Sequence, residues 1–371
     1  MKRTTLLLTV FTAAMVMALV MVAMAVPVFA GGGDDDEDND NESPNGSATR
    51  NGQIVFRRYF DPDQTKGALF TMNPDGSHIR QITHPPKSLP QDDSAAWSPD
   101  GQKIAFQREP IDFGTSRLMV VNPDTGNTRT VVPCTGERCV YIVDPAFSPD
   151  GHSIAYSRTV APPNAQDPPG WKLYSAIFIV GLDGKNSHQV TSTPKRQKGR
   201  PATDTFSPAF SPNGKMLTFV RANYQKENDP HAVFVQPLGS PEDARRITPW
   251  KLNCQDLPEF SPDDKLVLFR CLPEGEEGPS NLYWVHLDGT GLHQITHEDA
   301  DKQYLGSSFS PSFHKGEGWI TVGRTGGYGK EGNADVFRIL IEDGRVLRSV
   351  NLTKNTLWDS APNWGTHPSV G

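Results

Sequence analysis

The sequence predicts an all-β fold built from six copies of a four-stranded unit. Gly (33) and Pro (32) are frequent among the 371 residues, which suits many short strands joined by tight turns. An aromatic residue followed by a Ser-Pro turn recurs along the chain, and an apolar strand follows each turn. A second tight turn, Asp-Gly, comes later in most copies. These features exclude a helical bundle.

Each copy contains four expected strands in a fixed order. The first strand ends at the aromatic residue of the Ser-Pro turn, and these turns lie at 97–101, 147–151, 210–214, 260–264 and 309–312, with a shorter form at 364–365. The second strand is expected at 54–56, 104–106, 154–156, 217–219, 266–269 and 319–322. Third strands are clearest at 69–72, 118–121, 177–180, 282–285 and 336–339, and fourth strands at 81–83, 189–191, 246–248, 294–296 and 351–353. Repeated four-stranded units of this length form a β-propeller, whose blades pack around a central channel.

The two ends of the repeat region predict a closed ring of six blades. The region begins with the second strand of a blade at Ile54 and finishes with a lone first strand at 360–364. That strand can complete only the first blade, so the ring is expected to close with one C-terminal and three N-terminal strands. We therefore place the propeller at 52–366 and a short tail at 367–371.

A secretory signal peptide is expected at residues 1–30. Lys2 and Arg3 precede an apolar run from Leu6 to Phe29, and Ala30 supplies a small residue at the expected cleavage site. The run is also long enough to remain as an N-terminal membrane anchor. Residues 31–51 are rich in Asp and poor in apolar residues, which predicts a disordered acidic linker. The protein is therefore expected to be extracytoplasmic, either periplasmic or secreted.

Four cysteines in an exported chain predict two disulfides. Cys134 and Cys139 would close a small loop. Cys254 and Cys271 lie symmetrically about the turn at 261–264, so they are expected opposite each other on neighbouring antiparallel strands. A zinc site is the alternative, but the spacings match no common zinc-ligand pattern.

The repeated elements resemble the WD40-like, PD40-type propellers of the TolB group. The resemblance covers 52–364 and rests on the Trp/Phe-Ser-Pro-Asp-Gly turns and on Ile/Val/Leu-Thr pairs such as Ile82-Thr83. It implies a six-bladed propeller. TolB itself has an N-terminal α/β domain before its propeller, and it binds envelope partners. This chain has only the acidic linker before its first blade, so the resemblance does not extend to a Tol–Pal complex.

Two candidate binding sites lie on the face that carries the long inserts. Aromatic and basic residues suited to an acidic peptide or an anionic glycan are Trp171, Tyr174, Lys195, Arg196, Lys198 and Arg200. Acidic residues three to six positions before the strand aromatics are Asp93, Asp144, Asp204, Asp256 and Asp359. Converging carboxylates could hold Ca²⁺ or a basic side chain. The structural alternatives are a Trp covering its blade beside a solvated basic loop, and Asp residues that cap turns.

No catalytic residue is assigned from the sequence. Gly151-His152-Ser153 approaches a nucleophile elbow but lies in an expected hairpin. The nearly neutral body excludes the basic surface that nucleic-acid binding requires. The sequence therefore predicts a monomeric, non-catalytic scaffold that binds an envelope or extracellular protein or an anionic polymer. The alternative is a metal-dependent lyase or hydrolase that acts on acidic oligosaccharides at the channel mouth, by resemblance to the oligogalacturonate lyases.

Overall fold

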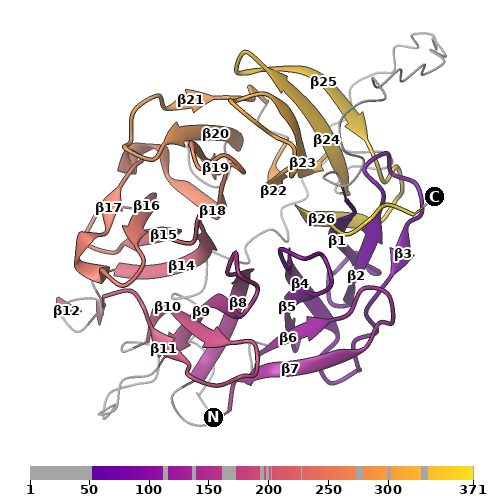
Figure 1. Cartoon of the computed structure of the whole chain (residues 1–371), viewed down its shortest axis with the longest axis horizontal. Coiled ribbons are helices and arrows are strands. Elements are labelled where there is room, and N and C mark those ends of the chain that lie inside the picture. Colours follow the sequence, from indigo (N-terminus) through magenta and orange to yellow (C-terminus); the bar gives the residue numbers. More distant parts are fainter. Residues whose placement is uncertain are drawn as a thin grey trace, which may run out of the picture. The chain divides into compact units, whose positions relative to one another are not determined.

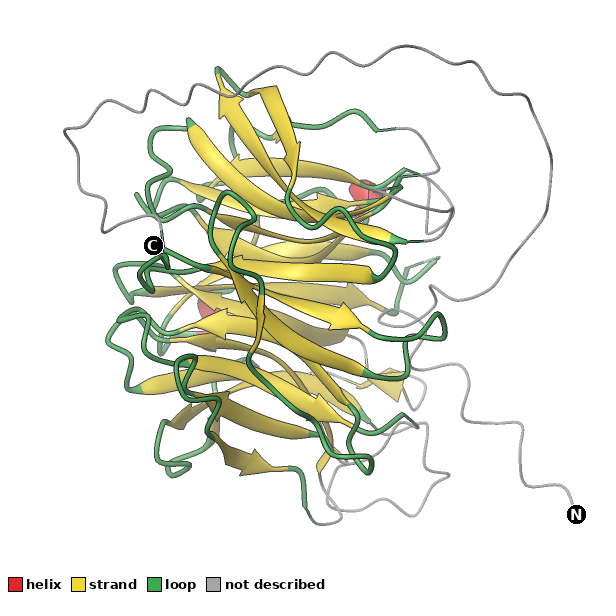
Figure 2. Cartoon of the chain, turned by 90° about the vertical axis from the view of Figure 1, so that its right-hand side faces the viewer, coloured by secondary structure: helices red, strands yellow, loops and turns green. Residues whose placement is uncertain are grey.

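The computed structural model describes residues 52–111, 116–135, 139–160, 173–192, 196–197, 200–201, 203–226, 228–272, 279–298, 302–326 and 333–370. These residues form β-strands and two short 3₁₀ helices, η1 (Pro241–Asp243) and η2 (Trp250–Leu252), as Figure 2 shows. Among them, no helix is long and apolar enough to span a membrane. The all-β prediction is confirmed. The expected signal peptide and acidic linker lie outside the described residues.

Sheets of mainly antiparallel strands follow one another around a common centre within residues 52–370 (Figure 1). We number the sequence copies 1 to 6 in chain order. Copy 1 contains β26 (Trp358–Trp364), β1 (Ile54–Tyr59), β2 (Gly67–Met72) and β3 (Arg80–Gln81). Copy 2 contains β4 (Gln91–Trp97), β5 (Ile104–Glu109), β6 (Arg117–Val121) and β7 (Thr128–Pro133). Copy 3 contains β8 (Cys139–Phe147), β9 (Ser153–Val160), β10 (Tyr174–Gly181) and β11 (His188–Gln189).

The second half of the chain repeats this pattern. Copy 4 contains β14 (Thr203–Phe210), β15 (Met216–Asn223), β16 (His231–Pro237) and β17 (Arg245–Arg246). Copy 5 contains β18 (Cys254–Phe260), β19 (Leu266–Cys271), β20 (Asn281–His286) and β21 (His293–Gln294). Copy 6 contains β22 (Tyr304–Phe309), β23 (Gly318–Thr325), β24 (Ala334–Glu342) and β25 (Arg345–Asn351). A separate hairpin pairs β12 (Arg196–Gln197) with β13 (Arg200–Pro201).

Apolar side chains fill the spaces between neighbouring sheets. Val55 and Leu69 of copy 1 pack against Ile104 and Phe106 of copy 2. The alternate side chains of β1 point to the opposite face of the strand. Two of them, Ile54 and Phe56, pack with Val336 of copy 6. The alternating pattern of a strand therefore buries both of its faces, one against each neighbouring copy.

A bulge recurs in the first strand of each copy, which lies nearest the centre in Figure 1. Three residues before the strand's aromatic, the backbone φ is positive at Ser94 (48°), Asp144 (53°), Ser207 (53°), Leu257 (21°), Gly306 (87°) and Ala361 (49°). The pairing between first and second strands shifts register at or beside this position. Such a bulge bends the strand and redirects its side chains.

Successive copies are also joined at the fourth strand. A side chain in or beside this strand donates a hydrogen bond to a carbonyl in the last turn of the next copy. The donors and acceptors are Arg80 and Pro123 (2.8 Å), Arg129 and Leu182 (2.7 Å), Ser192 and Pro241 (3.3 Å), Arg245 and Leu287 (2.7 Å), and His293 and Gly344 (2.6 Å). These contacts fix neighbouring sheets to each other at their outer ends.

The C-terminal strand β26 pairs antiparallel with β1, with Trp364 opposite Ile54 and Trp358 opposite Tyr59. Two disulfides are present, Cys134–Cys139 and Cys254–Cys271. Cys254 lies directly opposite Cys271 in the pairing of β18 with β19. The predicted disulfide pairing is therefore confirmed.

Candidate functional site

The first, inner strands carry all five carboxylates that the sequence placed near the central channel. Asp93 of β4 forms an ion pair with Arg57 of β1. The same guanidinium donates to the Ser360 hydroxyl of β26 at 2.7 Å. Arg57 therefore connects three strands from two copies, and the negative charge of Asp93 is compensated inside the protein.

Asp144 occupies the bulge position of β8 and joins the first strands of three copies. Its two carboxylate oxygens accept hydrogen bonds from the hydroxyls of Ser94 (3.1 Å) and Ser207 (2.8 Å). Its backbone N–H donates to the Gln107 side chain at 3.1 Å. Ser94 and Ser207 hold the equivalent bulge positions of copies 2 and 4. The recurring bulge thus turns three side chains toward one another.

The remaining predicted carboxylates have different partners. Asp204 accepts from the Ser175 backbone N–H (2.9 Å) and the Tyr224 hydroxyl (3.0 Å), and desolvation raises its pKa to about 6. Asp359 forms a bidentate ion pair with Arg58, with both nitrogen–oxygen distances 2.7 Å. Asp256 lies in β18, but its side chain is outside the described part of the chain.

The four of these carboxylates whose side chains are described, Asp93, Asp144, Asp204 and Asp359, each have separate partners. In the described ranges, no group of three or more His, Cys, Asp or Glu residues has an arrangement that could hold a metal ion. The Ca²⁺ site stays a prediction. The backbone hydrogen bond that Asp204 accepts comes from Ser175 in copy 3 and not from its own turn, so it does not test the expected turn cap.

Sequence reasoning missed Glu109, a buried carboxyl at the end of β5. The residue is 2% exposed and accepts hydrogen bonds from the Gln107 amide (3.2 Å) and the Tyr141 hydroxyl. Its second oxygen is buried and has no hydrogen-bond partner. Desolvation, together with the charge of Asp93, raises the pKa of Glu109 to about 8. Burial therefore favours the neutral form of the Glu109 carboxyl.

A second missed signal is an arginine at the same register of every second strand. These residues are Arg58, Arg108, Arg158, Arg221, Arg270 and Arg324, each four positions after a buried Ile or Leu near the start of its strand. Five of them lie over aromatic rings of their own copy, with Arg58, Arg108, Arg158, Arg221 and Arg324 between 4.2 and 5.4 Å from the ring centroids. Only an alignment of the copies with one another would have shown this position.

The predicted aromatic and basic site is described only in part. Trp171, Lys195 and Lys198 lie outside the described residues. Arg196 and Arg200 belong to the β12–β13 hairpin, and their side chains are likewise outside the description. Tyr174 begins β10, and its hydroxyl lies 3.4 Å from the Gln189 side-chain oxygen. This site stays a prediction.

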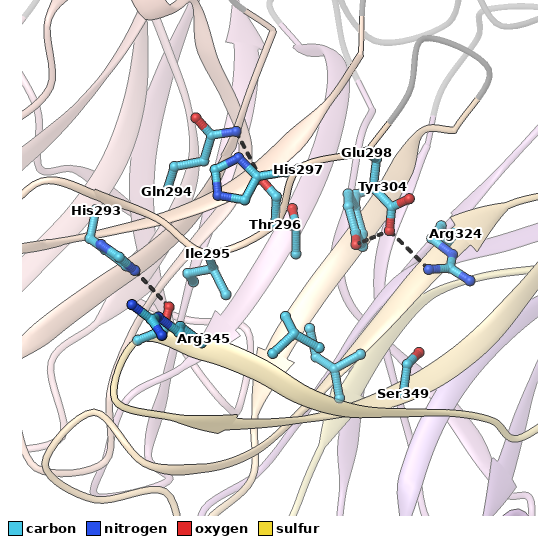
Figure 3. Close-up of a pocket in the computed structure, with 13 residues that line it drawn as sticks. His293, Gln294, Ile295, Thr296, His297, Glu298, Tyr304, Arg324, Arg345 and Ser349 are labelled. Carbon is cyan, nitrogen blue, oxygen red and sulfur yellow. Dashed lines mark hydrogen bonds and ion pairs between the residues drawn. The ribbon is translucent and has the colours of Figure 1, made fainter.

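A groove of about 440 Å³ opens between copies 5 and 6 (Figure 3). At one end, Glu298 accepts a hydrogen bond from Tyr304 and pairs with Arg324, both at 2.9 Å. Burial raises the pKa of Glu298, but the Tyr304 hydrogen bond and the Arg324 charge outweigh this effect and lower it overall. At the other end, His293 donates to the Gly344 carbonyl. Internal contacts therefore occupy the main polar groups at both ends of the groove.

The residues that approached a nucleophile elbow lie in a hairpin turn, as predicted. The Ser148 N–H donates to the Ser153 carbonyl at 2.9 Å, and Gly151 has a φ of 70°. His152 and Ser153 therefore join two antiparallel strands and do not form a strand-to-helix turn.

Comparisons of sequence with known proteins find one partial relative. No protein-family profile matches the chain. The curated dipeptidyl-peptidase 5 of Porphyromonas gingivalis is 29% identical over 166 residues, which are 43% of this chain and 22% of that protein. The matched part thus spans about a fifth of the relative's length.

Similar solved structures have low sequence identity. TolB from Acinetobacter baumannii has a TM-score of 0.57 and 18% identity over 85% of this chain and 67% of its own. Kuenenia stuttgartiensis hydrazine synthase has a TM-score of 0.59 and 12% identity, covering 86% and 47%. A chain of a nidogen/laminin complex has a TM-score of 0.55 and 8% identity, covering 85% and 98%. The fold is a β-propeller similar to that of TolB.

Proposed function

We propose that the chain forms a closed, six-bladed β-propeller that acts outside the cytoplasm as a non-catalytic binding module. The single observation that carries the non-catalytic part is the state of the inner carboxylates. Asp93 and Asp359 are held by arginines, and Asp144 by two serine hydroxyls. Side chains that form such ion pairs and hydrogen bonds stabilise the packing of the inner strands. They are poorly placed to bind a metal or attack a substrate.

The six-blade count and the closure by β26 are supported by contacts between successive copies. Fourth-strand donors join copies 1 to 2, 2 to 3, 3 to 4, 4 to 5 and 5 to 6. At the remaining junction, Gly76 of copy 1 lies so close to Leu352 of copy 6 that a Cβ would be 2.7 Å from the Leu352 carbonyl oxygen. This succession supports a ring in which each copy contacts the next.

A polypeptide is the ligand class that we favour. The match to a dipeptidyl-peptidase supports it, because that relative is named for acting on peptides. A chain of a complex between two proteins is also among the similar folds. Long loops that are positioned by a rigid scaffold often carry binding residues, because they can present varied side chains to a partner. Two disulfides support an oxidising, extracytoplasmic setting.

Capture from envelope extract tests this function. The full tagged chain is compared with a triple variant, Tyr174→Ala, Arg196→Ala and Arg200→Ala, at the predicted binding face. The matched control is Lys215→Ala with Lys265→Ala, which changes exposed lysines next to the Ser-Pro turns on the other face. We expect a saturable polypeptide partner that the control retains and the triple variant loses.

The metal-dependent enzyme is tested on the same preparations. Metal content and cleavage of acidic oligosaccharides are measured for the full chain and for Asp144→Asn. Bound metal in a one-to-one ratio, with turnover that Asp144→Asn abolishes, would overturn the non-catalytic proposal. Equal partner capture by the triple variant and the control would reject the predicted binding face.

A further inference from the structure

Two arginines flank a pair of aromatic rings on copy 4. The Arg221 guanidinium carbon of β15 lies 4.5 Å from the centroid of Phe234. Phe234 contacts Trp250, with ring centroids 5.9 Å apart. The Arg246 guanidinium carbon of β17 lies 5.3 Å from the centroid of the Trp250 ring. Two positive charges therefore border one aromatic surface.

This aromatic surface faces copy 3. Phe219 and Phe234 pack in one cluster with Ala155 and Ile177 of copy 3, and Trp250 packs against the same cluster. Arg221 thus lies beside the packing interface between copies 3 and 4. Its side chain is partly exposed, so solvent reaches it.

The other copies supply an internal comparison for Arg221. Arginines at the equivalent register are neutralised by carboxylates in three copies, where Arg58 pairs with Asp359, Arg108 with Asp92, and Arg324 with Glu298. In copy 4 the residue opposite Arg221 in β14 is Thr205, which carries no charge. The contact from Arg221 Nε to the Thr205 hydroxyl is 3.5 Å, at the limit of a hydrogen bond.

Neighbouring acids do not compensate the charge of Arg221. Asp204 precedes Thr205, but its two oxygens accept from Ser175 and Tyr224. Burial lowers the pKa of Arg221, and no carboxylate counters this effect. In the described part of the chain, neither Arg221 nor Arg246 forms an ion pair. A partly buried guanidinium in this state attracts an anion.

We propose that Arg221 binds an oxyanion, a carboxylate or a phosphate group, and that Arg246 adds positive charge to the same site. A guanidinium presents a planar fork of donors that matches both groups. Stacking on Phe234 holds the fork in place before the ligand arrives, which reduces the entropy lost on binding. The site deepens the proposed binding function and rests on it, because it would select a partner with an acidic or phosphorylated group.

Titration of the full chain with inorganic phosphate and, separately, with succinate tests the site without any partner. Calorimetry at matched ionic strength compares the wild type with Arg221→Gln and Arg246→Gln. We expect saturable binding of at least one probe, weakened about 10-fold by Arg221→Gln because charge-assisted hydrogen bonds are lost. Arg246→Gln should weaken binding about 2-fold, since this exposed charge acts through solvent.

The control is Arg117→Gln, which removes an exposed arginine of β6 in copy 2 and should leave binding unchanged. Arg221→Lys keeps the charge but loses the fork, so binding between that of wild type and Arg221→Gln is expected. If Arg221→Gln does not fold, Arg221→Lys and Arg246→Gln decide the matter. A preference for phosphate would indicate a phosphorylated partner, and a preference for succinate an acidic one.

Two results would overturn the site: no saturable binding of either probe, or equal binding by wild type and the Arg221 variants. Partner capture that persists in either case leaves the proposed function intact. Binding of the probes without capture of any partner would instead reject the proposed function and retain the anion site.

Discussion

The arginines at the shared register of the second strands have their buried charge compensated by different groups in different copies. Arg108 is 8% exposed and meets Asp92, which is fully buried, through two hydrogen bonds of 2.6 and 2.8 Å. Arg158 stands opposite Ile142 and lies over the Phe178 ring, with its carbon 5.3 Å from the centroid. A carboxylate compensates the full charge, whereas an aromatic face compensates only part of it.

Asp92→Asn tests how strongly the carboxylate contributes. The change leaves the Arg108 guanidinium buried without its anion, so we expect the free energy of unfolding to fall by about 3 kcal/mol. Urea unfolding followed by fluorescence measures this value. The control Thr205→Ala, at the equivalent register beside Arg221, removes a weak contact and should cost about 1 kcal/mol or less. Equal losses of unfolding free energy in both variants would show that the Asp92 carboxylate does not stabilise the buried Arg108.

Glu109→Gln tests the buried neutral carboxyl. Because folding raises the pKa of Glu109 from 4.5 to about 8, the folded state binds more protons between these values. The stability that this group contributes is complete below about pH 4.5 and is lost as the pH rises through 8. Gln cannot ionise, so we expect a smaller loss of Tm between pH 5 and 9, with Tm at pH 9 about 3 °C above wild type.

The exposed Glu242→Gln is the control for this pH dependence and should follow the wild type. Part of the slope should remain in Glu109→Gln, since desolvation also raises the pKa of Glu259 to about 8. Identical Tm profiles of the wild type and Glu109→Gln would show that Glu109 ionises normally.

At the scale of the strand, the sequence was a good guide to position and a poor one to local distortion. The repeated turns located the second strands, and the symmetry of Cys254 and Cys271 about their turn located a cross-strand pair. The bulges were not foreseen, because residues as different as Asp144 and Leu257 adopt the positive φ. Glu109 was missed for another reason: its pKa depends on Asp93 and on contacts that only the folded chain brings together.

Gly306→Ala tests the bulge of β22. This glycine has a φ of 87°, and an added Cβ would lie 2.9 Å from the Cα of Ala361 in the neighbouring inner strand. We expect the free energy of unfolding to fall by about 2 to 3 kcal/mol, from backbone strain and this close contact. Gly239→Ala is a matched control, since its φ is also 87° but no atom lies within 4 Å of the added Cβ. It should lose only about 1 kcal/mol, and an equal loss would mean that the two inner strands separate easily.

Over the whole molecule, stability depends on contacts between copies that are far apart in sequence. In three first strands, the residue just before the aromatic accepts a hydrogen bond from the first strand of the next copy. These bonds connect copies 5, 6, 1 and 2 in series. Glu259 accepts from the Phe309 N–H at 3.0 Å, Ser308 from the Trp364 N–H at 3.1 Å, and Asn363 from the Trp97 N–H at 2.9 Å. Because two of these three bonds involve β26, that strand connects the two ends of the repeat region.

Deleting residues 360–371 tests this connection. The truncation removes most of β26, so Trp97 and Ser308 lose their partners and β1 loses the strand that pairs with it. It also removes Trp364, which is 5% exposed and donates to the Gly52 carbonyl at 2.8 Å. We expect Tm to fall by more than 10 °C, or cooperative unfolding to disappear, because the loss leaves an open sheet edge and an uncovered core. Deleting only 369–371 removes the contacts of Val370 with Asn73 and should lower Tm by no more than a few degrees. If the chain ending at Asp359 unfolded like the full-length protein, β26 would not close the ring.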